Sequence, residues 1–109
     1  MVVRWQAKGG TPMPTYILLG KFTDQGIRNV KDTAKRAEAV RALAKKAKVT
    51  VKDMYWTLGK YDVVAILDAP DEATVAALGL GIGASGNVRM QTVRAFTEAE
   101  IGPILGKVG

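Results

Sequence analysis

The run Leu58–Asp62, near the middle of the chain, most constrains what this sequence can fold into. It separates an apolar, aromatic run at residues 53–58 from a β-branched, apolar run at residues 61–67. Gly59 can take a positive φ without a steric penalty, and glycine followed by another residue fits a two-residue type II′ turn. The pattern therefore predicts two neighbouring antiparallel strands joined by a tight hairpin. The residues expected to build this structural turn are Gly59, Tyr61 and Asp62.

The other apolar runs predict two more strands and a long first helix. Residues 15–22 and 88–96 are expected to be strands near the two ends of the domain. Apolar residues recur at three- and four-residue spacing between residues 27 and 47, which indicates one face of a helix. Thr23 is the expected cap of this helix, and the helix is expected to end near Lys48 with a break allowed around residues 32–33.

A second helix is expected to begin near Pro70 and to end at Gly86. Glycine in a helix interior costs about 1 kcal/mol relative to alanine, so its glycines predict a helix that is short, frayed or closely packed. Those glycines are Gly79, Gly81 and Gly83. The run Gly81–Gly86 matches G-x-G-x-x-G, but a dinucleotide site needs a strand before that motif and a helix after it. Here the order is reversed, so we interpret the run as a helix end and a tight turn.

The element order is β-α-β-β-α-β, which predicts an α+β, ferredoxin-like fold. In that fold both helices cover one face of a four-stranded antiparallel sheet. Thr97 to Glu100 has the capping-box pattern and predicts a short C-terminal helix. The domain is predicted to span residues 13–109, behind a strand-like arm at residues 1–12. The arm residues expected to dock on the same or a neighbouring subunit are Val3, Trp5 and Ala7.

The predicted strands lack the alternation expected of a sheet with one face in water. Tyr16 and Leu18 lie on one side of the first strand, but Ile17 and Leu19 on its other side are equally apolar. Two helices cover only one face. We therefore expect a second subunit to pack on the open face and form a dimeric α+β barrel.

Composition excludes several kinds of site. The chain has 109 residues, no cysteine and no histidine, which removes the commonest nucleophile–base pairs and metal ligands. We therefore predict no metal, no cofactor and no catalytic residue, although an enzyme remains an alternative. No apolar run is long enough to span a bilayer, and no signal peptide is visible, which favours a cytoplasmic protein without a membrane partner. The net charge of +6 is interpreted as a solvated helix face rather than a nucleic-acid site.

Polar residues within the strands are the best candidates for a binding site. Side chains that point into a space between subunits are able to hold a small anionic ligand such as a carboxylate. The candidate ligand-binding residues are Lys21, Tyr55, Arg89, Gln91 and Arg94. The alternative is that the charged ones discourage edge-to-edge aggregation. For catalysis, Asp62 is the first carboxylate to consider, but an acid beside a turn more often accepts hydrogen bonds from nearby amides.

Several ordered motifs resemble the GYD-domain family: Tyr16–Thr23, the Gly59–Asp62 turn, Asn87–Arg89 and Thr92–Phe96. This resemblance covers residues 13 to about 100 and implies a dimeric α+β barrel with no settled biochemical role. A weaker similarity runs to the ligand-binding domains of Lrp/AsnC-type regulators, which share the Gly-x-Tyr-Asp turn. It implies small metabolites bound at subunit interfaces and higher oligomers.

Three functions follow from these patterns. The first is a non-catalytic, self-associating domain that dimerises through its open sheet face and is linked by its arm into a ring or filament. The second is a sensor that binds a small anionic or amino-acid-like metabolite between subunits. The third is a cofactor-free enzyme of the α+β-barrel type, which needs a buried carboxylate or lysine with a shifted pKa.

Overall fold

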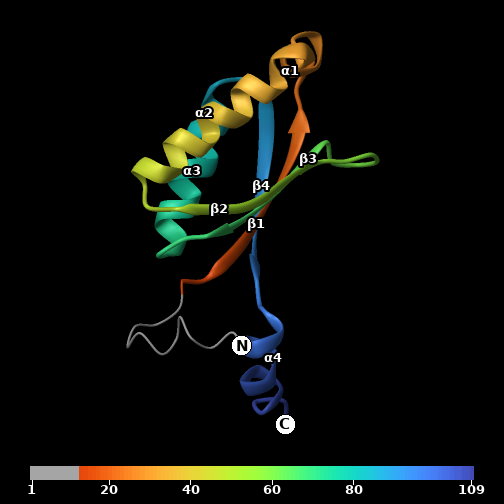
Figure 1. The fold of residues 1–109 in the computed structure, drawn as a ribbon. Coiled ribbons are helices and arrows are strands. Elements are labelled where there is room, and N and C mark those ends of the chain that lie inside the picture. Colours follow the sequence, from red (N-terminus) through yellow and green to blue (C-terminus); the bar gives the residue numbers. More distant parts are fainter. Residues whose placement is uncertain (1–12) are drawn as a thin grey trace.

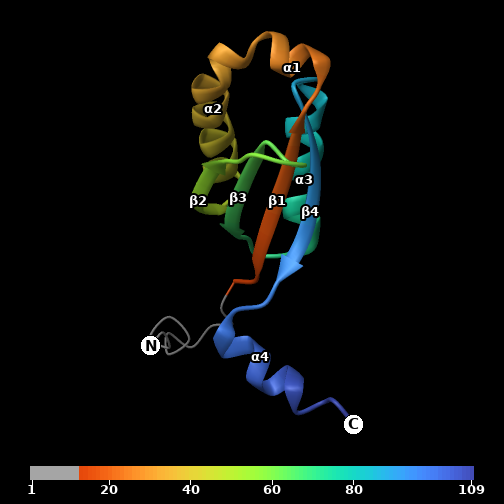
Figure 2. The same cartoon turned by 90° about the vertical axis from the view of Figure 1, so that its right-hand side faces the viewer.

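Four strands form one antiparallel sheet in the computed structural model, which describes residues 13–109. They are β1 (Thr15–Phe22), β2 (Thr50–Trp56), β3 (Val63–Asp68) and β4 (Val88–Ala95). Their spatial order is β2-β3-β1-β4, so β1 and β3 are central and the other two are edges (Figures 1 and 2). This is the predicted α+β, ferredoxin-like arrangement. The predicted arm, with Val3, Trp5 and Ala7, lies outside the described residues.

The first helical region is broken, as the sequence allowed. It comprises α1 (Asp24–Arg28), the 3₁₀ turn η2 (Val30–Asp32) and α2 (Thr33–Lys46). Thr23 caps α1, because its side-chain oxygen accepts a hydrogen bond from the Gly26 amide at 3.0 Å. Arg36 of α2 donates to the Asn29 carbonyl oxygen at 2.9 Å, which ties α2 back to the break. The chain therefore changes direction between α1 and α2, and α2 lies along the sheet (Figure 1).

The second main helix, α3 (Glu72–Ala84), runs without interruption through its three glycines. Asp71 caps it by accepting a hydrogen bond from the Thr74 amide at 2.7 Å. The expectation of a short or frayed helix is therefore wrong, and the glycines are also not tightly enclosed. A Cβ on Gly79 would lie 3.5 Å from Thr92 Oγ1, and one on Gly81 would lie 3.8 Å from Leu43, both ordinary contacts. Beyond the helix, Gly86 takes a φ of +85° and turns the chain into β4.

The hairpin between β2 and β3 is longer than the sequence suggested. β2 ends at Trp56 and β3 begins at Val63, so residues 57–62 connect them and the expected two-residue type II′ turn is wrong. The Thr57 amide donates to the Asp62 carbonyl oxygen at 2.8 Å, which closes the base of the loop. Gly59 does adopt a positive φ, of +102°, within this loop. The strands on either side pair antiparallel as predicted.

The C-terminal helix α4 (Glu98–Leu105) has the expected capping box, with Thr97 and Glu100 exchanging hydrogen bonds. It continues through Pro103 into its last turn. In both overall views α4 projects beyond the end of the sheet, away from α2 and α3 (Figures 1 and 2).

The core lies between the sheet and the layer of α2 and α3. Its largest fully buried side chains are Leu18 of β1, Leu67 of β3 and Val75 of α3. No helix covers the opposite face of the sheet within residues 13–109 (Figure 2). The strands thus have one closed face and one open face, which is the feature that positions the candidate site.

Candidate functional site

The open face of the sheet carries two adjoining rows of mainly apolar side chains. Side chains alternate along a strand, so residues between the buried ones lie on the open face. In one row Ile17 of β1 lies between Ile66 of β3 and Val93 of β4. In the next row Leu19 of β1 lies beside Val64 of β3. All five of these side chains are half-buried rather than buried, because no element within residues 13–109 covers them.

The Gly59–Asp62 turn is fastened onto the sheet by residues of two other strands. One carboxylate oxygen of Asp62 accepts a hydrogen bond from the Phe22 amide at 2.8 Å, and the Asp62 amide donates to the Gly20 carbonyl oxygen at 2.8 Å. The Tyr61 hydroxyl donates to Gln91 Oε1 of β4 at 2.7 Å. These bonds hold residues 57–62 against the end of β1.

The tip of this loop stands out from the open side of the molecule. In Figure 1 the loop projects on the side of the sheet opposite α2 and α3. Leu58, at the tip, is fully exposed. A large aliphatic side chain held by a fastened loop next to an apolar sheet face is typical of a surface that another molecule covers.

The five predicted ligand-binding residues do not form one cluster. Lys21 and Arg89 are direct cross-strand partners on β1 and β4, and Gln91 follows two positions along the same side of β4. Tyr55 lies in the same row as Gln91 but on the far edge strand, three strand spacings or about 14 Å away. Arg94 lies on the opposite, helix-covered face, because it is one residue out of phase with Arg89 and Gln91 on β4.

Arg94 is occupied within its own chain. Its guanidinium donates to the carbonyl oxygens of Thr15 and Ala95 and pairs with Glu100 at 3.3 Å. It also lies 4.4 Å from the centre of the Phe96 ring. Hydrogen bonds from the Thr97 amide and, to a lesser extent, from Arg94 hold the pKa of the Glu100 carboxyl below its usual range. Arg94 therefore positions α4 relative to the sheet.

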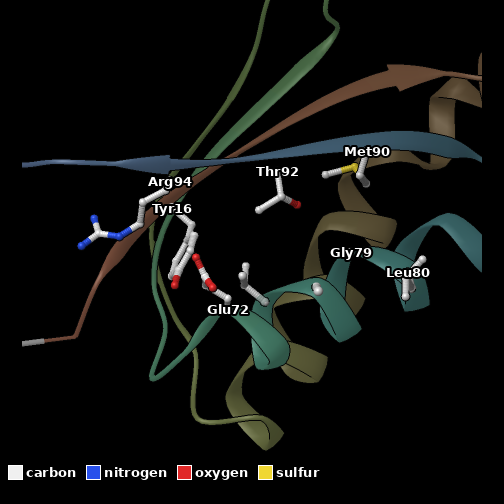
Figure 3. A pocket seen from close by; sticks show the side chains of 9 residues that line it. Tyr16, Glu72, Gly79, Leu80, Met90, Thr92 and Arg94 are labelled. Atoms are coloured by element: carbon white, nitrogen blue, oxygen red, sulfur yellow. The ribbon is translucent and has the colours of Figure 1, made fainter.

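A pocket of about 450 Å³ opens between α3 and β4 on the helix-covered side (Figure 3). Its lining residues are Tyr16, Glu72, Val75, Ala76, Gly79, Leu80, Met90, Thr92 and Arg94. Figure 3 shows Tyr16 beside Glu72 at one end of the pocket, with the Arg94 guanidinium turned away from α3. Burial, followed by the negative charge of Glu72, raises the pKa of the Tyr16 phenol, so this hydroxyl stays neutral. The sequence did not single out this pocket, because Tyr16 is one member of an apolar run.

Several acidic side chains of the described region act as hydrogen-bond acceptors. Asp62 accepts a hydrogen bond from the Phe22 amide of β1, Asp71 caps α3, and Glu100 takes part in the capping box of α4. The Thr74 amide lowers the pKa of Asp71, which makes this carboxylate a weaker base. Within residues 13–109, acidic side chains do not gather in any group of three or more suited to a metal ion. None of the helices in this part of the chain combines the length and the hydropathy required to cross a bilayer.

Comparison with known proteins identifies the family of this chain. The GYD domain family matches residues 16–105, and the chain belongs to that family. A protein of Thermus thermophilus named "Glutamine synthetase and cystathionine beta-lyase binding protein" is 36% identical to it over 90 residues. That match covers 82% of this chain and 95% of the relative. No solved structure matches the chain.

Proposed function

We propose that this chain is a non-catalytic protein-interaction module that pairs with a second copy through its open sheet face. The observation that carries this proposal is the pair of apolar rows on that face, centred on Ile17, Ile66 and Leu19. Burying apolar surface stabilises an association by roughly 25 cal/mol per Å² before the costs of binding. Two such sheets packed face to face remove both apolar surfaces from water at once.

The 57–62 loop supports the same arrangement. It stands on the open side and is anchored to β1 through Asp62, so it is positioned to reach over a second sheet. Contact with a second copy would cover Leu58, which is otherwise fully exposed. The hydrogen bonds of Tyr61 and Asp62 would favour this contact, because a loop that is already held in place loses less conformational entropy on association.

Light scattering of the purified chain tests the pairing. We expect at least a two-chain mass for the unmodified protein and a clear loss of that pairing for Ile66→Glu, since a charge in the centre of the contact is costly to bury. Val30→Glu is the matched control, because Val30 is a β-branched, exposed residue of η2 on the other side of the sheet. Circular dichroism checks that each variant is folded. A single-chain mass for the unmodified protein at about 50 µM, where a micromolar contact is mostly formed, would contradict the proposal.

The name of the Thermus relative extends the proposal to other proteins. That relative is described as binding two enzymes, and 36% identity over nearly its whole length makes a similar role for this chain the natural inference. The test is biosensor binding of this chain to purified glutamine synthetase and cystathionine beta-lyase from its own organism. Serum albumin is the control. Absence of binding at about 10 µM to both enzymes would count against this part of the proposal.

A small-anion site is the second candidate function, and one observation favours it. Lys21 and Arg89 lie directly opposite each other on β1 and β4, and two like charges in that position repel unless an anion lies between them. We expect millimolar citrate or phosphate to raise the melting temperature of the unmodified protein. The melting temperature of the double variant Lys21→Met/Arg89→Met should not rise. An equal rise in both proteins would remove this candidate.

A further inference from the structure

Helix α3 is apolar on every side, although only one of its sides faces the core. After Glu72 and Thr74 it contains no polar side chain as far as Ala84. Its outer residues are exposed, and Leu80 on the crest is 76% exposed. An all-round apolar helix is normally covered on both sides. The remaining exposed residues of this outer side are Ala73, Ala76, Ala77, Gly81 and Ala84.

A groove runs between α3 and α2 on this outer side. It consists of two hollows of about 640 and 200 Å³ that share Leu43 and Gly81. Small side chains of α3 form one wall, and α2 contributes the other with Lys46 and Arg36 along it. Residues 24–48 carry eight Lys and Arg against three Asp and Glu, a net charge of +5 out of +6 for the chain. The groove is thus an apolar channel with a basic flank.

A second apolar surface lies on α4, and no other element of residues 13–109 covers it. Ile101 and Leu105 lie four residues apart, which places them on one side of α4, and Val108 follows three residues later, just beyond the end of the helix. Their exposed fractions are 40%, 60% and 71%. The other side of α4 faces its own chain, because Glu100 binds Arg94 there. Glu98 lies three residues before Ile101 and adds a negative charge at the start of the outward stripe.

These two surfaces do not meet within one chain. Both overall views place α4 beyond the end of the sheet, away from the groove (Figures 1 and 2). The Arg94–Glu100 pair and the capping box hold it there. Any contact between the α4 stripe and the groove therefore joins two different copies.

We propose that the outward stripe formed by Ile101 and Leu105 of α4, together with Val108 just beyond the helix, docks in the α2–α3 groove of a second copy. The shapes match, since large branched side chains on α4 meet alanine and glycine positions on α3. The charges also match, since Glu98 approaches the basic flank of α2. The other arrangement, groove against groove of a second copy, is disfavoured because both grooves carry the same basic flank from residues 24–48.

This contact is heterologous, because a helix of one copy meets a groove of the next. Repeated contacts of this kind produce rings or filaments, whereas face-to-face sheets produce closed pairs. The contact lies on the helical side of the molecule and does not involve the open sheet face (Figure 1). It therefore does not depend on the proposed pairing and would link such pairs into larger assemblies.

Cysteine cross-linking tests the proposal directly, because the chain contains no cysteine of its own. A Leu105→Cys chain is mixed with an Ala77→Cys chain that carries a mass tag, and the mixture is oxidised. A disulfide needs Cα atoms within about 7 Å, so only docking of α4 in the groove brings these two positions together efficiently. We expect the mixed disulfide to exceed that from Leu58→Cys with Ala77→Cys by about tenfold, equal to about 1.4 kcal/mol of preference. Equal yields from Leu105→Cys and Leu58→Cys would overturn the proposal.

Light scattering separates this contact from the open-face pairing. We expect Leu105→Glu to reduce the mass to that of two chains, and Ile66→Glu/Leu105→Glu to give single chains. If Leu105→Glu lowers the mass while Ile66→Glu does not, the α4 contact stands and the open-face pairing fails. If Leu105→Glu leaves the mass of the unmodified protein unchanged, the α4 contact is refuted.

Discussion

The two faces of the sheet differ far more in burial than in composition. Leu18 and Leu67 face the helices and are 1% and 0% exposed, whereas their strand neighbours Ile17 and Ile66 face the open side and are only half-buried. In the middle of the two central strands the residues on both faces are aliphatic, so the hydrophobic effect favours burial of either face. The difference shows that the placement of two helices decides which apolar face is closed within one chain and which one requires another molecule.

Shortening one side chain on each face gives the largest expected contrast. We expect Leu67→Ala to lower the free energy of unfolding by about 2–5 kcal/mol at any protein concentration, because it leaves a cavity in the core. Ile66→Ala, one residue away on the open face, should cost less in dilute solution and more as pairing increases with concentration. Urea unfolding at two concentrations measures both. If the two variants lose the same free energy of unfolding at both protein concentrations, the distinction between the faces is wrong.

The next largest effect is expected on the open side, where the Asp62 carboxylate holds the 57–62 loop against β1. Asp62→Ala leaves the Phe22 amide without its carboxylate partner, so we expect a loss of about 1–3 kcal/mol in the free energy of unfolding. Lys60→Ala in the same loop is the control, with an expected change within about 0.5 kcal/mol at this exposed position. If the loop contacts a second copy, Asp62→Ala should also shift the pairing equilibrium, as measured by light scattering. An Asp62→Ala protein as stable as Lys60→Ala would show that the fastening contributes nothing.

Comparing alanine substitutions at Gly59 and Gly102 measures how much the positive φ of the turn contributes to stability, because an added Cβ meets no close atom at either position. Gly59 has a φ of +102° with no atom within 4 Å of an added Cβ, so Gly59→Ala should cost about 1–2 kcal/mol through conformation alone. Gly102, in α4, also has open space but no positive φ, so Gly102→Ala should stabilise the chain by up to about 1 kcal/mol. Thermal unfolding measures both. The same sign for the two substitutions would contradict this account of the turn.

The smallest expected effect is the pH dependence of the α4 cap, which belongs to neither face. The folded pKa of Glu100 lies below its ordinary value of 4.5, so its contribution is present above that pH and is lost as pH falls through the folded pKa. Glu100 is partly exposed, so we expect Glu100→Gln to cost about 0.5–1 kcal/mol at pH 7. That cost should shrink below pH 4.5 in urea unfolding. A difference that does not change between pH 7 and pH 3 would show that the charge of Glu100 plays no part.

Much of the fold was predictable because its signals are local in the sequence. Thr23 and the Thr97 capping box mark helix starts by hydrogen bonds that span only a few residues. The break around residues 32–33 and the antiparallel pairing across Gly59 also follow from short patterns. The length of the β2–β3 loop was not predictable in the same way. It depends on the bonds from Asp62 to β1 and from Tyr61 to β4, which are distant in sequence.

The candidate site was predictable only in part, for the same reason. Arg89, Gln91 and Arg94 share one strand, and the sequence grouped them together. Arg94 lies five positions after Arg89, an odd number, so side-chain alternation along the strand places Arg94 on the helix-covered face and the other two on the open face. The pocket beside Tyr16 was missed because α3 forms one of its walls, and residues 16 and 72–80 meet only after folding.

The sequence by itself determined the order of the elements, the family and the presence of apolar residues on both faces of every central strand. Those properties come from short-range periodicity, turn chemistry and capping, which a chain carries before it folds. Only the tertiary structure decided which face the helices close, that Leu58 stands exposed beside the open one, and that α4 projects away from the groove between α2 and α3. These outcomes depend on packing between segments far apart in sequence, because a single side chain has no burial until another element is placed against it.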